Sequence, residues 1–251
     1  MSFVFHIPHA SKVIPKEYLK HFVLSPEEIN EEILKMTDHY TDQLFEFDAI
    51  TQKTLKFPVS RLLADPERFA SDSEEVMSKV GMGCVYEKTH NGKQLKHALK
   101  IRDELISKYY QPHHERFTNM VDECLKLNSK CLIVDCHSFP KRPLPYELHQ
   151  ESERAEICIG TDEYHTPDWL FDFMNDAFKS AGFSVAVNKP FSGSIVPSIY
   201  WKKTKEVSSV MIEVRRDTYM NESSGNKSEN FDKIKIKINN ILTNLAENYL
   251  R

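Results

Sequence analysis

Two short apolar runs that each end in histidine are the feature that most constrains this chain. Residues 3–5 lead into His6 and His9, and residues 131–134 lead into Asp135 and His137. Such runs predict buried β-strands, and the C-terminal ends of strands are where α/β proteins hold their chemistry. One histidine at a strand end is more often a hydrogen-bonded structural residue. Two of them, with a third apolar strand at residues 210–216, favour a metal site.

The rest of the chain alternates between β-rich and helical segments. The expected strands lie at residues 2–7, 57–63, 131–136, 155–160, 183–187 and 208–214. Strands that alternate with helices predict an α/β fold. We therefore expect a three-layer sandwich, in which a mixed, mostly parallel sheet is covered by helices on both faces.

Helix-start signals lie at residues 25–28, 166–168 and 228–229. The first has an N-cap serine, proline at N1 and glutamate at N3, and it predicts a helix that reaches about Phe47. Residues 92–129 predict a long helix or helical pair that Pro112 is expected to kink or break. Residues 71–92 lack periodicity and predict a long surface loop of the kind that often serves as a lid.

Length and composition favour a single domain over residues 1–251. No linker divides the 251 residues, and the 40% apolar and 28% charged content is ordinary for a soluble protein. No segment approaches the roughly 18 apolar residues of a membrane span, and the N-terminus lacks the basic region of a signal peptide. The net charge of −4 gives no electrostatic footprint for nucleic acid. We expect neither a membrane nor a nucleic acid as partner, and a monomer or small homo-oligomer.

The cysteines bear on the compartment. The chain has five, an odd number, and none is spaced as CxxC. Buried free thiols in a reducing environment explain this pattern best, so we expect a cytoplasmic protein.

Eight polar clusters follow one another in an order that is specific as a set, although each is weak alone. They span residues 8–15, 37–42, 60–68, 110–114, 135–139, 159–162, 188–193 and 213–220. The series resembles the N-formylglutamate amidohydrolase family from about residue 6 to residue 220. The resemblance implies a phosphorylase/hydrolase-like fold, similar to that of zinc carboxypeptidases. It also implies a zinc-dependent amidohydrolase that cleaves a linear amide of an N-acyl amino acid, with N-formylglutamate giving formate and glutamate in the best-known members.

His9 and His137 are the histidines that we expect to bind the metal. Two imidazoles and one carboxylate form an open zinc site with a position left for water, so we expect one Zn²⁺, or another divalent ion, per chain. Spacing does not decide between Asp38 and Asp42 as the carboxylate. Asp38 is our choice because it lies closest to the start of its motif, and Asp42 could then contact an imidazole N–H.

Glu213 is the expected general base, since it ends a strongly apolar strand and could take a proton from the attacking water. The alternative is a salt bridge with Arg215 or Arg216. His114 matches a recurrent position of the family, and we expect it to have a structural role.

Arg61 and Arg68 lie within one short segment at and beyond the end of the expected strand at 57–63. Their planar guanidinium groups suit the carboxylates of a small acidic substrate or a developing oxyanion. We assign Arg61 to catalysis and Arg68 to substrate binding. The alternative for both is pairing with Asp65 or Glu67.

Ser138, Gly193 and Arg216 complete the expected substrate contacts, with Gly193 permitting a tight turn that presents backbone N–H groups. The chain departs from the family pattern at Glu67, where asparagine is usual, at residues 163–165 and at Ser194. These departures keep two alternatives open. One is a zinc carboxypeptidase-like deacylase for another small substrate, and the other is a metal-free relic that binds a small acid.

Overall fold

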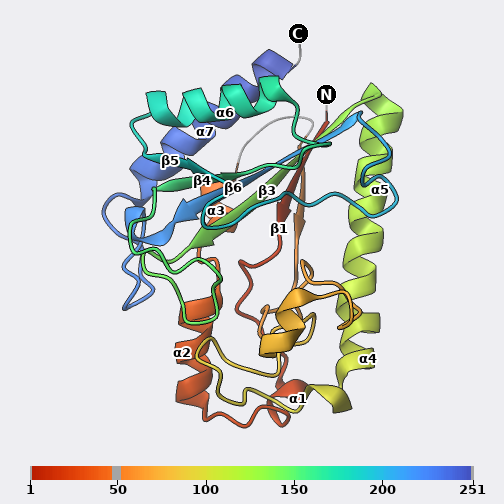
Figure 1. Cartoon of the computed structure of the whole chain (residues 1–251), viewed down its shortest axis with the longest axis vertical. Helices are drawn as coiled ribbons and strands as arrows, with labels where there is room; N and C mark the ends of the chain where they lie inside the picture. The colour runs from red at the N-terminus through yellow and green to blue at the C-terminus, as the bar shows by residue number, and fades with distance from the viewer. Residues whose placement is uncertain (1, 47–51, 250–251) are drawn as a thin grey trace.

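The computed structural model describes residues 2–46 and 52–249 and contains a six-stranded sheet (Figure 1). Its strands are β1 (Ser2–Ile7), β2 (Gln52–Lys56), β3 (Cys131–Phe139), β4 (Ile157–Gly160), β5 (Val185–Val187) and β6 (Val207–Arg215). They lie in the order β2-β1-β3-β6-β4-β5, and every neighbouring pair is parallel except β4 with β6. The predicted mixed, mostly parallel α/β sheet is confirmed.

Helices cover both faces of this sheet because successive strand residues point to opposite sides. Phe3 and Phe5 of β1 pack in one apolar cluster with α6 (Asp168–Ser180) and α7 (Phe231–Tyr249). Val4, the residue between them, packs in another cluster with α5 (Gln111–Asn128). Figure 1 shows α6 and α7 on one side of the strands and α5 on the other. The result is the expected three-layer arrangement.

A third apolar cluster lies beyond the strand ends. It gathers side chains from α1 (Lys16–Leu19), α2 (Pro26–Met36), the segment 57–64 and α4 (Arg102–Leu105). Figure 1 shows α1, α2 and α4 below the end of β1. The remaining short elements are α3 (Thr41–Leu44), the 3₁₀ turns η1 (Val76–Val80), η2 (Ala98–Lys100) and η4 (Arg216–Thr218), and the π-helical turn η3 (Ile106–Tyr110). This cluster supports the loops that carry residues of the site.

The strand predicted at 57–63 is wrong. The strand of this region is β2, which precedes that segment. Its sequence is polar because it lies at the sheet edge, where Leu55 is buried and the lysines stay partly exposed. Residues 57–64 instead form a turn, and their apolar side chains pack in the third cluster. They are hydrophobic because they are buried there, although they pair with no strand.

Two helix predictions also change. The helix from Ser25 has its predicted capping box but ends at Met36, where Thr37 turns extended. Its predicted end near Phe47 lies outside the described residues. The segment 92–129 becomes α-helical only from Arg102. Pro112 does not break it, because the π turn η3 ends at Tyr110 and α5 begins at Gln111, which places the proline in the first turn of α5.

None of the helices within residues 2–46 and 52–249 combines the length and the apolar content that a bilayer crossing requires.

Lys96 lies fully buried in the third cluster. Its Nζ donates to the carbonyl oxygen of Leu62 and lies 5.5 Å from the centre of the Phe22 ring. Burial lowers the pKa of Lys96 from 10.5 to about 7. The unfolded chain keeps this proton up to the ordinary pKa, whereas the folded chain releases it near pH 7. The folded state therefore binds fewer protons between these values, and its stability rises with pH across that window.

We predict that Lys96→Met flattens this dependence. The free energy of unfolding, measured in urea from pH 6 to pH 9, should rise with pH more steeply in the wild type than in the variant. The exposed Lys100→Met serves as control and should follow the wild type. Parallel pH profiles for wild type and Lys96→Met would show that Lys96 carries no such shift.

Candidate active site

The strands β1, β3 and β6 are adjacent and parallel, so their C-terminal ends meet at one edge of the sheet. His6 pairs in register with Asp135, and His137 pairs with Glu213. His9 follows β1 by two residues. The sequence of these strands thus places imidazoles and carboxylates side by side.

A cavity of about 310 Å³ opens at this edge. It is lined by every residue that the sequence predicts for the site, namely His9, Asp38, Arg61, Arg68, His137, Ser138, Gly193, Glu213 and Arg216. Asp42, the other aspartate considered as a ligand, is not among the lining residues and pairs with Lys56. What each side chain does in the cavity stays a prediction.

Asp38 faces the Nδ1 atoms of both imidazoles. Its Oδ2 lies 3.1 Å from His137 Nδ1 and 3.6 Å from His9 Nδ1. The residue reaches this place because α2 ends before it and its backbone N–H donates to the His9 carbonyl at 3.0 Å. Burial opposes ionisation, but His137, His9 and Arg216 hold the pKa of Asp38 well below its ordinary value.

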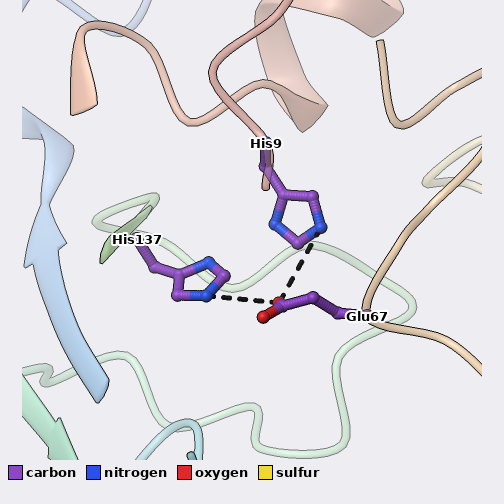
Figure 2. A group of neighbouring side chains, drawn as sticks. All are labelled: His9, Glu67 and His137. Atoms are coloured by element: carbon purple, nitrogen blue, oxygen red, sulfur yellow. Dashed lines mark ion pairs between the residues drawn. The ribbon is translucent and has the colours of Figure 1, made fainter. Parts of the chain in front are cut away.

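The Nε2 atoms of the two imidazoles face other buried carboxylates. His9 Nε2 donates to Asp65 Oδ1 at 2.8 Å, and His137 Nε2 lies 3.0 Å from Asp135 Oδ1. Glu67 lies between them, with Oε2 at 3.2 Å from His137 Nε2 and 3.8 Å from His9 Nε2 (Figure 2). Each imidazole is therefore flanked by carboxylates at both nitrogens.

Among the described residues, two three-residue groups bring their possible ligand atoms within 4.8 Å of one another. One is His9, Glu67 and His137, and the other is His6, Glu67 and Asp135. Two ring nitrogens of the site, His9 Nδ1 and His137 Nε2, are buried and have no hydrogen-bond partner within residues 2–46 and 52–249. Unpaired buried nitrogens of this kind are costly unless a proton donor or a cation faces them.

Glu213 lies beside this array at the end of β6. The carboxylate is buried, and its Oε2 has no hydrogen-bond partner among the described residues. Burial raises the pKa of Glu213 to about 8, against the opposing effect of His137. No ion pair joins it to Arg215 or Arg216 in the described part of the chain, where Arg215 pairs with Asp217 and Arg216 with Asp38.

The three arginines of the cavity differ in how far their donors are occupied. Arg61 donates from Nη2 to Asp65 at 2.8 Å and from Nε to Tyr86 at 3.1 Å. The Nε of Arg68 is buried without a hydrogen-bond partner among the described residues. Arg68 thus leaves a buried Nε donor unused at the cavity.

Arg216 is fully engaged by the protein. It donates to the Lys35 carbonyl at 2.6 Å, to Asp38 Oδ1 at 3.1 Å, and to the hydroxyl and carbonyl of Ser138 at 3.3 Å each. The Ser138 backbone N–H also donates to Asp38, at 3.2 Å. These bonds fix the Asp38 carboxylate in front of the imidazoles.

Several residues of the array were not predicted as site residues, including Asp65, Glu67, His6 and His113. Asp65 and Glu67 lie between the predicted arginines in the sequence, and His6 precedes His9 by three residues. Closeness in sequence to predicted site residues was the signal that could have found them. His114, for which we expected a structural role, lies 2.9 Å from the Pro66 carbonyl and bonds to the segment that carries Glu67. Gly193 has a φ of +89°, which favours glycine at this turn of the cavity wall.

Comparison with known proteins places this arrangement in a family. The family model of N-formylglutamate amidohydrolase matches residues 1–220. The fold is similar to a crystal structure of N-formylglutamate amidohydrolase from Ralstonia eutropha JMP134, with a TM-score of 0.84, 20% identity, and coverage of 98% of this chain and 93% of that one.

A gene product of Agrobacterium tumefaciens is similar with a TM-score of 0.60 at 20% identity, over 98% of this chain and 92% of the other. A search of curated proteins finds no match. The family model spans the three strand ends and the loops that build the cavity. On that match, this chain belongs to the N-formylglutamate amidohydrolase family.

Proposed function

We propose that this protein is a metal-dependent amidohydrolase that cleaves the amide bond of an N-formyl amino acid, with N-formylglutamate as the first substrate to test. The observation that carries the proposal is the buried, unpartnered Oε2 of Glu213 beside His137, at a cavity that Arg68 also lines. A carboxylate with an unpartnered oxygen beside an imidazole, and a guanidinium with an unused donor at the same cavity, supply a base and an anchor for an acidic substrate.

His9, Asp38 and His137 are the residues that we propose to hold one divalent ion. The fit rests on the unpartnered Nδ1 of His9 and on Asp38 Oδ2, which faces Nδ1 of both imidazoles. Two imidazoles and one carboxylate favour Zn²⁺, and other divalent ions bind the same donors. When bound, such an ion polarises the substrate carbonyl and acidifies the attacking water.

Asp65 and Asp135 support this assignment from the other side of the rings. They lie 2.8 Å from Nε2 of His9 and 3.0 Å from Nε2 of His137. A carboxylate on the second nitrogen fixes the tautomer and orientation of a metal-binding histidine. Arg216 and Ser138 hold Asp38 in the same way, so we propose that they position the ligand, in place of the direct substrate contact expected from the sequence.

Glu213 acts as the general base in this proposal. Its Oε2 takes a proton from the attacking water and returns it to the nitrogen of the leaving amine. Gly193 lines the same cavity, and the turn that it permits presents backbone N–H groups to the substrate in this proposal.

Arg68 binds a carboxylate of the substrate through the donors that the protein leaves unused. Arg61, whose Nε and Nη2 bond to Tyr86 and Asp65, keeps its remaining N–H groups for the oxyanion that develops at the carbonyl. In this proposal Arg68 anchors the substrate and Arg61 contributes to catalysis.

We further propose that residues 1–251 act as one catalytic domain in the cytoplasm, as a monomer or small homo-oligomer. All five cysteines are buried free thiols, which supports a reducing compartment.

We predict that His137→Ala and Asp38→Asn each lose the tightly bound metal, because each removes one of three ligands. Zinc content after gel filtration, measured by elemental analysis, should fall from about one equivalent to near zero in both. Asp42→Asn is the matched control, since Asp42 pairs with Lys56 outside the cavity, and should keep its zinc. Full zinc in Asp38→Asn together with its loss in Glu67→Gln would instead assign the carboxylate ligand to Glu67.

We predict that Glu213→Gln keeps the metal but lowers kcat by about 10²-fold or more, the usual scale for loss of a general base. Formate release from N-formyl-L-glutamate measures kcat, and elemental analysis of the same sample confirms zinc. An unchanged kcat would remove Glu213 from the chemistry.

We predict that Arg68→Lys raises KM for N-formyl-L-glutamate with a cost of about 1 to 3 kcal/mol, because lysine keeps the charge but loses the planar pair of donors. N-formyl-L-glutamine, which keeps the α-carboxylate but lacks the side-chain carboxylate, serves as the comparison and should lose less. The turnover of a panel of N-formyl and N-acetyl amino acids then tests the acyl group. Equal turnover of acidic and neutral members by the wild type would contradict a carboxylate anchor.

A further inference from the structure

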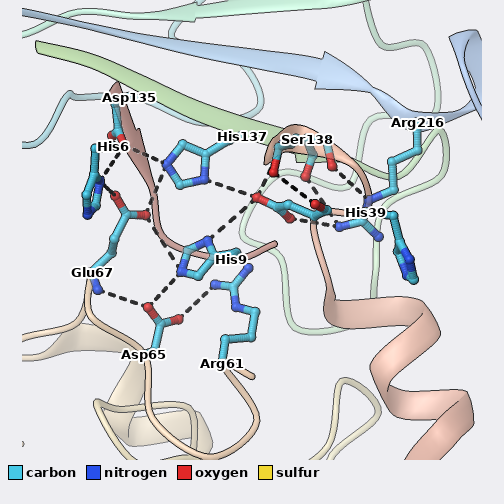
Figure 3. Close-up of polar contacts among 12 residues, drawn as sticks. His6, His9, His39, Arg61, Asp65, Glu67, Asp135, His137, Ser138 and Arg216 are labelled. Atoms are coloured by element: carbon cyan, nitrogen blue, oxygen red, sulfur yellow. Dashed lines mark hydrogen bonds and ion pairs between the residues drawn. The ribbon is translucent and has the colours of Figure 1, made fainter. Parts of the chain in front are cut away.

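Glu67 and Asp135 form a second negative centre beside the proposed metal ligands. Figure 3 shows both carboxylates on the side of the imidazoles where His6 lies. His6 Nδ1 lies 2.9 Å from Asp135 Oδ1 and 3.6 Å from Glu67 Oε1. These three residues bring one possible ligand atom each within 4.8 Å of one another. His6, Glu67 and Asp135 therefore offer the same types of ligand, imidazole and carboxylate, as the residues that fit a divalent ion at His9 and His137.

Neither carboxylate has a permanent cation to balance it. Asp65 pairs with Arg61 and Asp38 pairs with Arg216, but no lysine or arginine within residues 2–46 and 52–249 forms an ion pair with Asp135 or Glu67. Asp135 is 2% exposed, so its charge is not screened by solvent. A buried carboxylate without a fixed positive partner is costly, and a bound cation offsets that cost.

His137 provides an independent sign that a ligand belongs there. Its side chain is buried, and its Nε2 has no hydrogen-bond partner among the described residues, although it lies 3.0 Å from Asp135 and 3.2 Å from Glu67. The ring therefore points a polar atom at the two carboxylates without a well-aligned bond to either. Asp135 Oδ1 shares its hydrogen bond with His6 Nδ1, and a cation bound between these two atoms would replace that bond.

His6 is oriented for the same purpose by His113. The two Nε2 atoms lie 2.9 Å apart, so one ring must donate and the other accept. Stacking on Phe117, with ring centres 4.9 Å apart, fixes the plane of His6. When His6 donates from Nε2 to His113, its Nδ1 turns a lone pair towards Asp135 and Glu67. A neighbour that holds the far nitrogen in this way is typical of a metal-binding histidine.

We propose that His6, Glu67 and Asp135 bind a second divalent cation, of the kind that accepts one imidazole and two carboxylates, such as Zn²⁺ or Mn²⁺. Glu67 and Asp135 line the cavity, so an ion reaches the site from solvent. Through Glu67, the cation holds the 65–68 segment, which carries the anchoring Arg68. The inference rests on the proposed function, because the ion at His9, Asp38 and His137 makes this one the second.

Metal stoichiometry tests the second site separately from activity. Chelator-stripped protein is brought to equilibrium by dialysis against increasing Zn²⁺, and in a parallel series against Mn²⁺, and bound metal per chain is measured by elemental analysis. The wild type should saturate at two equivalents, one of them weaker. Glu67→Gln should saturate at one equivalent and keep the tight site, whereas Asp38→Asn should lose the tight site. Glu17→Gln, an exposed glutamate paired with Lys108, is the matched control and should bind as the wild type does.

Saturation of the wild type at one equivalent would overturn the second site and leave the proposed function intact. Two equivalents in Glu67→Gln would also overturn it. Glu67 is 18% exposed at the cavity wall, and far-UV circular dichroism of each variant verifies that the fold is kept. A wild type that binds no metal in either titration would contradict the proposed function itself. The two failures are therefore distinguishable.

Discussion

The contacts between buried imidazoles and carboxylates at three strand ends are the interaction on which the rest of the site depends. His9 and His137 each lie between Asp38 on one side and Asp65 or Asp135 on the other. Such an array is stable only when each charge finds a partner. Arg61 and Arg216 supply two of these partners. Four side-chain atoms of the cavity residues remain buried without a hydrogen-bond partner among the described residues, on His9, Arg68, His137 and Glu213.

The topology of the sheet brings the imidazoles and carboxylates of the site together. Three parallel strands, each apolar along its length, end at the same edge, so the register alone brings His137 beside Glu213 and His6 beside Asp135. The loops then add what the strands cannot. The break between α2 and α3 delivers Asp38, and the turn after β2 delivers Arg61, Asp65 and Arg68. The strands thus position His6, His137 and Glu213, whereas loops carry Asp38 and the arginines of the 60–68 segment.

Local pattern predicted the layers of the fold, because strand runs and helix caps are encoded in a few consecutive residues. The nine residues that the strand ends and the family resemblance assigned to the site all line the cavity, but Glu67 and Asp135, which also line it, were not among them. Local pattern failed at β2, where an edge strand of lysine and threonine shows no apolar run, and at residues 57–63, whose apolar character comes from a separate cluster. It also could not find the pairing of His6 with His113, 107 residues apart, or the engagement of Arg216 with Asp38. Such contacts depend on tertiary geometry, which spacing along the chain does not encode.

The location of a bound ion tests the central claim most directly. Crystals grown with Zn²⁺ and measured on both sides of the zinc absorption edge give an anomalous difference map that places the metal without reference to activity. The account predicts the strongest peak among His9, Asp38 and His137. A map whose strongest peak is in contact with none of these three residues would contradict it.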